Sequence, residues 1–398
     1  MNSNTSNPLG AAKPYGILVV LWLVGWTLRV PILAAPPLAT RIADSFGLGE
    51  AAEGALTMLP VVTIAFGAIP AAWIIAKFGL RIAIVAGLLV MTAASVARGQ
   101  VPSPALLFAA SAIMGLGVAV FQTALPAATR VWTPSHVALG SAVYLNGMML
   151  GELSGAGLTL PIVLPLAGGD WRLALGLWAI PIVLIALLVA LVRVPKDPSS
   201  QSETGLPQGP SLPKWNDLRV WQYGLLLASS VVAFFVVNAY SGSLLQSRGE
   251  YDAAEAFHFA YNAMPLAASF TVLMVPGWVG LRAPIAVAAV FSALGLAGFT
   301  ILDGWASWVS AMVTGFAATI ELILLVSLPP AIAKGIAVTR LSAGMTLISF
   351  SIAFLLTLLG GGLADRQDWL EMALMPSLVF MVVALAALGR SARYPGYE

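Results

Sequence analysis

Long apolar runs alternate with short polar connections along nearly the whole chain. Each run holds about the twenty residues that a helix needs to cross a bilayer. The pattern predicts twelve such helices and therefore an all-α membrane protein. In chain order they are expected at residues 15–37, 50–76, 81–99, 104–130, 136–165, 171–194, 218–247, 253–279, 283–301, 305–332, 337–363 and 369–390.

A polar stretch near the middle of the chain interrupts this pattern. Residues 195–217 contain five prolines and many polar side chains, which is typical of a flexible linker. The linker separates six predicted helices from six, so we expect two six-helix bundles, at residues 13–194 and 218–398. Residues 1–12 are small and polar, and we expect them to be disordered.

Short sequence matches relate the two halves. Gly79-Leu80-Arg81 recurs as Gly280-Leu281-Arg282, and Leu59-Pro60 has a counterpart in Met264-Pro265. Both pairs keep nearly the same offset along the chain. We therefore expect two pseudo-symmetric bundles with a substrate between them.

Basic residues indicate how the chain is oriented. If both termini and the linker are cytoplasmic, few of the 19 Lys and Arg fall on the opposite side: Arg41, Arg98, Arg172, Arg248 and Arg366. The positive-inside rule favours this arrangement, in the cytoplasmic membrane. The first run is longer than a signal peptide's apolar core and carries Arg29 near the end where a signal is apolar, so we expect it to be retained.

Composition excludes several classes of protein. The chain is 59% hydrophobic and only 9% charged, whereas a soluble domain has roughly a quarter of charged residues. It has no cysteine, and its two histidines, His136 and His258, are far apart and expected in loops, so we expect no metal site and no cofactor. Basic residues form no stripe for nucleic acid. The motifs GxxxxGK[ST], HExxH and GxSxG are absent, so we expect no enzyme.

Arg29 is the one charge near the middle of the first apolar run. A charge at that depth costs at least about 2.5–3.5 kcal/mol, so Arg29 needs an anion, a carboxylate partner or water. Its planar fork of donors suits carboxylates and other small oxyanions. Two roles fit these facts: a cation that binds substrate in a transport pathway, or an ion pair that holds two helices together.

Glu152 and Glu321 are the other charges predicted near the centres of helices. A buried carboxylate either finds a cation or takes a proton. If Arg29 pairs with Glu152 inside the first bundle, Glu321 in the second is left as a candidate proton site. The alternative for Glu321 is a structural role, with hydrogen bonds to nearby hydroxyl groups.

Uncharged polar residues within the predicted helices are candidates for binding a solute. They can donate and accept hydrogen bonds around a ligand, or can simply join helices to one another. The candidates are Gln122, Tyr144, Asn146, Asn238, Tyr240, Tyr261 and Asn262. Trp22 and Trp26 can line the same cavity, although aromatic residues of membrane helices more often face lipid or other helices.

Several stretches carry a family resemblance. The loop from Lys77 to Arg81 resembles the basic-glycine loop of the major facilitator superfamily, and Gly147 to Gly155 resembles the glycine motif of its antiporters. Within that superfamily, Thr27 to Arg29, Leu56 to Thr63 and Gly115 to Gln122 resemble the cyanate and nitroimidazole permease family. The resemblance implies a two-bundle transporter of small anions or compact polar solutes.

These observations together predict a secondary active transporter. We expect it to move a small anionic or compact polar solute by alternating access, coupled to protons, and to work as a monomer. A proton-driven multidrug efflux pump of the same fold is an alternative. A channel is a weaker one, because a channel needs pore-lining rings or filter loops.

Overall fold

The computed structural model describes residues 14–192, 194, 213–333 and 336–388, and nearly all of them are helical. The predicted disorder of residues 1–12, and most of the predicted linker, lie outside the described residues. The described part of the first half begins with one interrupted crossing and continues with five more. Its helices are α1 (Pro14–Thr27), α2 (Val30–Leu33), α3 (Ala39–Phe46), α4 (Glu50–Phe78), α5 (Leu80–Gln100), α6 (Pro104–Trp132), α7 (Val137–Leu158), α8 (Leu164–Leu166), α9 (Trp171–Leu177) and α10 (Ala179–Leu191).

The second half repeats this arrangement. Its helices are α11 (Leu218–Ser247), α12 (Ala254–Met274), α13 (Arg282–Ile301), α14 (Gly304–Val326), α15 (Leu328–Ile332), α16 (Ile336–Gln367) and α17 (Met375–Ala384). The helix α11 has the bounds that the apolar pattern predicts. The helix α12 ends five residues earlier than predicted, because Pro276 disfavours helical geometry at Val275, whose φ is −130° and ψ is 62°.

The described part of the chain makes twelve helical crossings, as the apolar pattern predicts. Within the described residues, eleven helical segments are long and apolar enough to span a membrane. The helix α12 makes the remaining crossing, and polar side chains such as His258 and Asn262 lower its hydropathy. The fold class is therefore an all-α membrane protein with two six-helix bundles.

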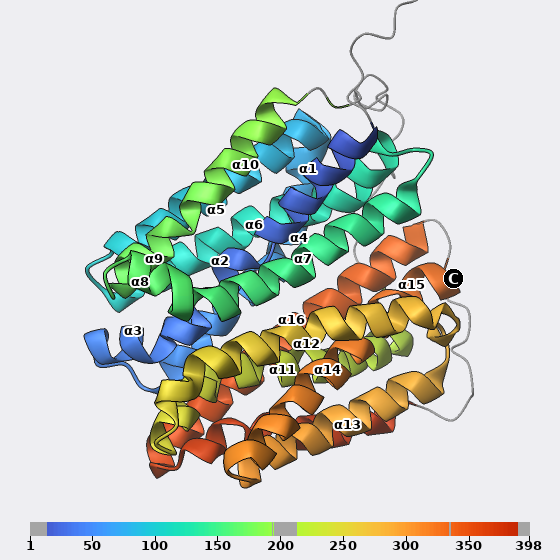
Figure 1. Ribbon diagram of the computed structural model, residues 1–398. Helices are drawn as coiled ribbons and strands as arrows, with labels where there is room; N and C mark the ends of the chain where they lie inside the picture. The colour runs from blue at the N-terminus through green and yellow to red at the C-terminus, as the bar shows by residue number, and fades with distance from the viewer. Residues whose placement is uncertain (1–13, 193, 195–212, 334–335, 389–398) are drawn as a thin grey trace, which may run out of the picture.

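The two bundles lie side by side (Figure 1). The first runs from blue to green and the second from yellow to red. The helix α4 of the first bundle packs against α11 and α16 of the second, and α7 packs against α12. These two sets of contacts form the seam between the bundles.

The repeat seen in the sequence is also present in the backbone. Gly79 and Gly280 have nearly equal positive φ angles, 81° and 84°, a conformation that glycine adopts without strain. Pro60 and Pro265 both lie inside a helix, α4 and α12 respectively. The matched positions therefore have matched local structure.

The seam is tightly joined at one end of the molecule. We call the end near residues 213–218 the linker end and the opposite end, where α4 begins, the far end. At the far end, the Asp365 carboxylate of α16 accepts hydrogen bonds from the backbone N–H groups of Glu50 (2.7 Å) and Ala51 (3.1 Å) of α4. Ser243 of α11 donates to the Glu53 carboxylate of α4 at 2.7 Å.

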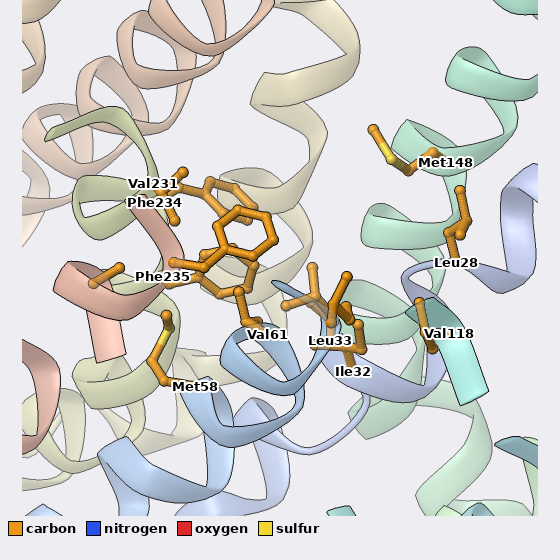
Figure 2. Close-up of a cluster of buried hydrophobic side chains, with 14 of the residues drawn as sticks. Leu28, Ile32, Leu33, Met58, Val61, Val118, Met148, Val231, Phe234 and Phe235 are labelled. Carbon is orange, nitrogen blue, oxygen red and sulfur yellow. The ribbon is translucent and has the colours of Figure 1, made fainter. Parts of the chain in front are cut away.

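An apolar layer lies deeper in the same seam. Figure 2 shows Phe234 and Phe235 of α11 pointing toward Val61 of α4, with Leu33 of α2 nearby. All four side chains are buried. The far end is therefore closed by polar contacts above an apolar layer.

Candidate functional site

The first crossing is broken where Arg29 stands. The helix α1 ends at Thr27 and α2 starts at Val30, instead of the continuous helix predicted over residues 15–37. Pro31 has no N–H to donate to the Thr27 carbonyl, which weakens the helix at the point where it breaks. Arg29 takes φ −120° and ψ −26° and caps the short α2. A broken helix inside a membrane is typical of transporter binding sites.

The side chain of Arg29 lies between two helices of its own bundle. Its Nε is 3.2 Å from Oε1 of Glu152 on α7, and its Nη1 donates to Oε1 of Gln122 on α6 at 3.3 Å. Arg29 is 8% exposed and Glu152 is 5% exposed. Arg29 and Glu152 therefore form the pair that the sequence offered as one possibility.

The glycines of α7 explain why Glu152 reaches Arg29. Gly147, Gly151 and Gly155 follow one another at four-residue spacing along one face. A side chain at any of them would collide with a backbone carbonyl of the first crossing, at Trp22, Trp26 and Val30 respectively. The absence of side chains lets the two backbones touch, as small residues do in other membrane helices.

Two tryptophans fix the register of this contact. Trp22 Nε1 donates to Oδ1 of Asn146, and Trp26 Nε1 donates to the Ser154 hydroxyl, both at 3.0 Å. Trp22 and Trp26 therefore face a neighbouring helix and anchor it. Tyr144, two residues before Asn146 on α7, is half-buried.

Three of the four polar candidates of the second bundle, Asn238, Tyr261 and Asn262, lie together on α11 and α12. Asn262 Nδ2 donates to Oδ1 of Asn238 at 3.0 Å, and the Tyr261 hydroxyl donates to the Phe234 carbonyl at 3.2 Å. Tyr261 is buried on α12, the helix that packs on α7 across the seam. Tyr240 lies apart from this group, nearer the far end, where its hydroxyl donates to the Thr357 carbonyl at 2.6 Å.

Glu321 occupies a separate position on α14. It is fully buried, and its Oε1 accepts a hydrogen bond from the Ser229 hydroxyl of α11 at 2.7 Å. Its Oε2 has no partner among the described residues, and the structure gives it no salt bridge there.

The sequence did not predict the burial of three polar residues. Glu53 of α4 is 5% exposed, so it is a third buried carboxylate in addition to Glu152 and Glu321. Arg98 is 1% exposed and donates to the Pro31 carbonyl at 2.8 Å, next to the break in the first crossing. The loop position expected for His258 is wrong, because it lies inside α12 at 1% exposure.

His136, by contrast, is exposed just before α7, as expected. Glu53 and Arg98 lie near helix ends, where charges ordinarily reach the interface, so their positions alone gave no sign of burial. Within the described residues, no three His, Asp or Glu side chains gather closely enough to hold a metal ion.

This arrangement can bind a small anion or a planar polar group. Of the five N–H donors of a guanidinium, contacts with described residues use only Nε and Nη1 of Arg29. A carboxylate or similar group can therefore bind the rest of the fork. Such a group can also compete with Glu152 for the Arg29 guanidinium.

Comparison with known proteins gives a family match and several relatives. A profile of the Major Facilitator Superfamily matches residues 17–323. The 2-nitroimidazole transporter of Escherichia coli (strain K12) is 27% identical over 301 residues, which cover 73% of this chain and 74% of the relative. The cyanate transport protein CynX of the same strain is 25% identical over 244 residues, which cover 58% of this chain and 62% of the relative.

A third relative is the gentisate transporter of Corynebacterium glutamicum (strain ATCC 13032), 22% identical over 295 residues that cover 70% of this chain and 65% of the relative. Among solved structures, a bacterial homologue of the human lysosomal transporter Spinster has a TM-score of 0.73 at 17% identity, with 95% of this chain and 97% of that chain covered. The xylose transporter XylE from E. coli has a TM-score of 0.74 at 14% identity, with 94% and 98% covered.

Proposed function

The chain belongs to the major facilitator superfamily of membrane transporters, and we propose that it carries a small anionic or compact polar solute between its two bundles by alternating access. The observation that carries the proposal is Arg29, a buried cation in a broken helix whose fork is only partly occupied. Transfer of a charge into this depth is costly, which favours a functional use for it.

The named solutes of the relatives agree with this chemistry. Cyanate and gentisate are small anions, and 2-nitroimidazole carries a planar nitro group with two oxygens. Gentisate and 2-nitroimidazole each present two oxygen atoms on one group, and cyanate presents one oxygen at one end. A guanidinium fork suits such an end, because it offers parallel donors in one plane.

A binding experiment tests this role. Purified protein is screened by thermal shift with cyanate, gentisate and 2-nitroimidazole, and with the lipophilic cation tetraphenylphosphonium. We expect at least one of the first three to stabilise the protein. We expect its affinity to fall in Arg29→Lys and further in Arg29→Ala, since Lys keeps the charge and loses the fork. Stabilisation by the lipophilic cation alone would instead support a multidrug pump.

Coupling to protons is the second element of the proposal. Glu152 is paired with Arg29. Among the described residues, Glu53 and Glu321 have no salt bridge, and Glu321 is the one that is fully buried and lies beyond the first and last turns of its helix. Burial disfavours the charged form of a carboxyl group. Protonation of Glu321 can therefore shift the equilibrium between two conformations that expose it differently. For an anionic solute, a proton carried in the same direction offsets the solute's charge.

Two proteoliposome measurements test the coupling. One follows solute uptake driven by a pH gradient, and the other follows exchange of labelled for unlabelled solute without a gradient. In Glu321→Gln we expect the gradient-driven uptake to be lost and the exchange to remain. If both persist, Glu321 has a structural role, and the same selective loss in Glu152→Gln would move the proton site to Glu152.

The proposal also assigns sides to the molecule. We place the linker end in the cytoplasm, following the distribution of basic residues. The closed far end then faces outside. The proposed domain bounds are residues 13–194 and 218–398, joined by the linker at 195–217.

A further inference from the structure

Two polar pairs stand at neighbouring levels between α11 and α12. The two helices are consecutive and antiparallel, so Ser241, one turn after Asn238, stands level with His258, one turn before Asn262. All four side chains are buried, with at most 1% exposed. They form two levels of one polar patch inside the second bundle.

One level is hydrogen-bonded and the other is not. Asn262 Nδ2 donates to Asn238 Oδ1 and to the His258 carbonyl, both at 3.0 Å. The Ser241 hydroxyl, both ring nitrogens of His258 and Oδ1 of Asn262 have no hydrogen-bond partner among the described residues. Each buried polar atom left unpaired costs about 1–3 kcal/mol, and native structures hold few of them. Four such atoms in one place therefore indicate a function.

The patch faces the interior and the other bundle. His258 shares the buried face of α12 with Ala254, Tyr261 and Pro265, so it points away from lipid. Phe259, the chain neighbour of His258, packs against Gly157 of α7, the helix that also carries Glu152, the partner of Arg29. The helix α12 also packs directly on α7, which carries Glu152. The patch is therefore on the side of the second bundle that faces the Arg29 site.

We propose that Ser241, His258 and Asn262 form a second binding subsite, which holds the uncharged hydrogen-bonding end of the solute whose oxygen-bearing end binds Arg29. This inference rests on the proposed function and narrows its substrate class. A neutral imidazole offers one donor and one acceptor, a hydroxyl offers both, and the free amide oxygen accepts. The matching ligand group donates and accepts as well, as a phenol hydroxyl or a ring N–H beside a ring nitrogen does. The solute is thus a small planar acid or nitro compound that also carries an uncharged hydroxyl or ring N–H.

The chain has two histidines, which makes one experiment especially direct. The full-length protein is labelled with ¹⁵N-histidine and titrated with gentisate or 2-nitroimidazole, and binding is followed in parallel by thermal shift. We expect the ring signals of buried His258 to move on binding, while exposed His136 stays unchanged as the internal control. Binding with no change at His258 would overturn the subsite and leave the proposed function standing. Binding of none of the solutes would overturn the proposed function, and the subsite with it.

Matched variants and ligands separate a binding role from a structural one. Benzoate is gentisate without its two hydroxyls. His258→Phe keeps an aromatic ring and loses both hydrogen-bonding atoms, whereas His258→Gln keeps a donor and an acceptor. In His258→Phe we expect gentisate affinity to fall about tenfold or more, benzoate affinity to stay within about twofold, and thermal stability without ligand to be maintained.

In His258→Gln we expect part of the gentisate affinity to return. Equal loss of gentisate and benzoate affinity, or no loss of either, would contradict the subsite. If His258→Phe does not fold, Ser241→Ala gives the same comparison at the opposite side of the patch, with a smaller loss expected for gentisate alone.

Discussion

Removing one member of the Arg29–Glu152 pair leaves the other as a buried, unpaired charge. The two groups are 3.2 Å apart and each is more than nine-tenths buried. At an effective dielectric constant of about 20, charges at that distance attract with about 5 kcal/mol. Loss of one partner of such a pair typically costs about 3–5 kcal/mol. We therefore expect Arg29→Met and Glu152→Leu each to lose about that much stability.

The double variant distinguishes the pair from two independent sites. With both charges gone, neither is left unpaired, so we expect Arg29→Met/Glu152→Leu to lose less than either single variant. The coupling energy of the cycle should then be about 3 kcal/mol or more. Protonation of Glu152 removes its unpaired charge, so the loss in Arg29→Met should be smaller at about pH 5 than at about pH 8, while Glu152→Leu shows no such dependence.

Equilibrium unfolding by SDS in mixed micelles, followed by tryptophan fluorescence, measures these free energies. Gln122→Leu is the control, because it removes only a neutral acceptor of Arg29, at 3.3 Å. We expect this variant to lose about 1.5–3 kcal/mol at most. Additive single-variant losses, with a coupling energy below about 0.5 kcal/mol, would refute the pairing.

Three further predictions address the packing, the closed end and the linker. Gly151→Ala should lower the melting temperature and solute affinity, since the new methyl group meets a carbonyl of the first crossing, while the control Gly176→Ala, which has open space, should not. Asp365→Asn should weaken the far-end contact by about 1 kcal/mol. As a result, an impermeant thiol reagent should label a cysteine introduced by Leu33→Cys severalfold faster; the natural chain has no cysteine that would interfere. Protease should cut within residues 195–217 and leave two bundles that migrate together in detergent.

Each of these has a contrary outcome. Equal melting temperatures for the two glycine variants would mean that the backbones of α1 and α7 are not in contact. Unchanged labelling in the Asp365 variant would mean that the apolar layer alone closes the far end. If either bundle is degraded after the cut, the proposed domain bounds are wrong.

The sequence predicts the fold well because one physical demand dominates it. A bilayer requires apolar helices of a set length, so the crossings follow from hydropathy, and α11 has the predicted bounds of 218–247. One departure is the first crossing, where Pro31 breaks the helix and places Arg29 at the break. A proline inside a crossing can bend or break it, and its neighbours in space decide which.

The candidate site is only partly predictable for a different reason. The cost of a buried charge identifies Arg29, Glu152 and Glu321 without any structure, and the glycine spacing of α7 indicates a close helix contact. Which helix is in contact depends on packing between residues more than a hundred positions apart, as in the pair of Arg29 and Glu152. His258 was misplaced because histidine lowers hydropathy, whether it lies in a loop or in a polar patch between helices.

Solute exchange by the reconstituted protein tests the central claim most directly. Proteoliposomes are loaded with the unlabelled form of whichever of gentisate, cyanate or 2-nitroimidazole gives the largest thermal shift, and uptake of the labelled form is followed in wild type, Arg29→Lys and Arg29→Ala. We expect rapid uptake by wild type, weaker uptake by Arg29→Lys, and none above empty liposomes for Arg29→Ala. Uptake by correctly folded Arg29→Ala equal to that of wild type would contradict the account.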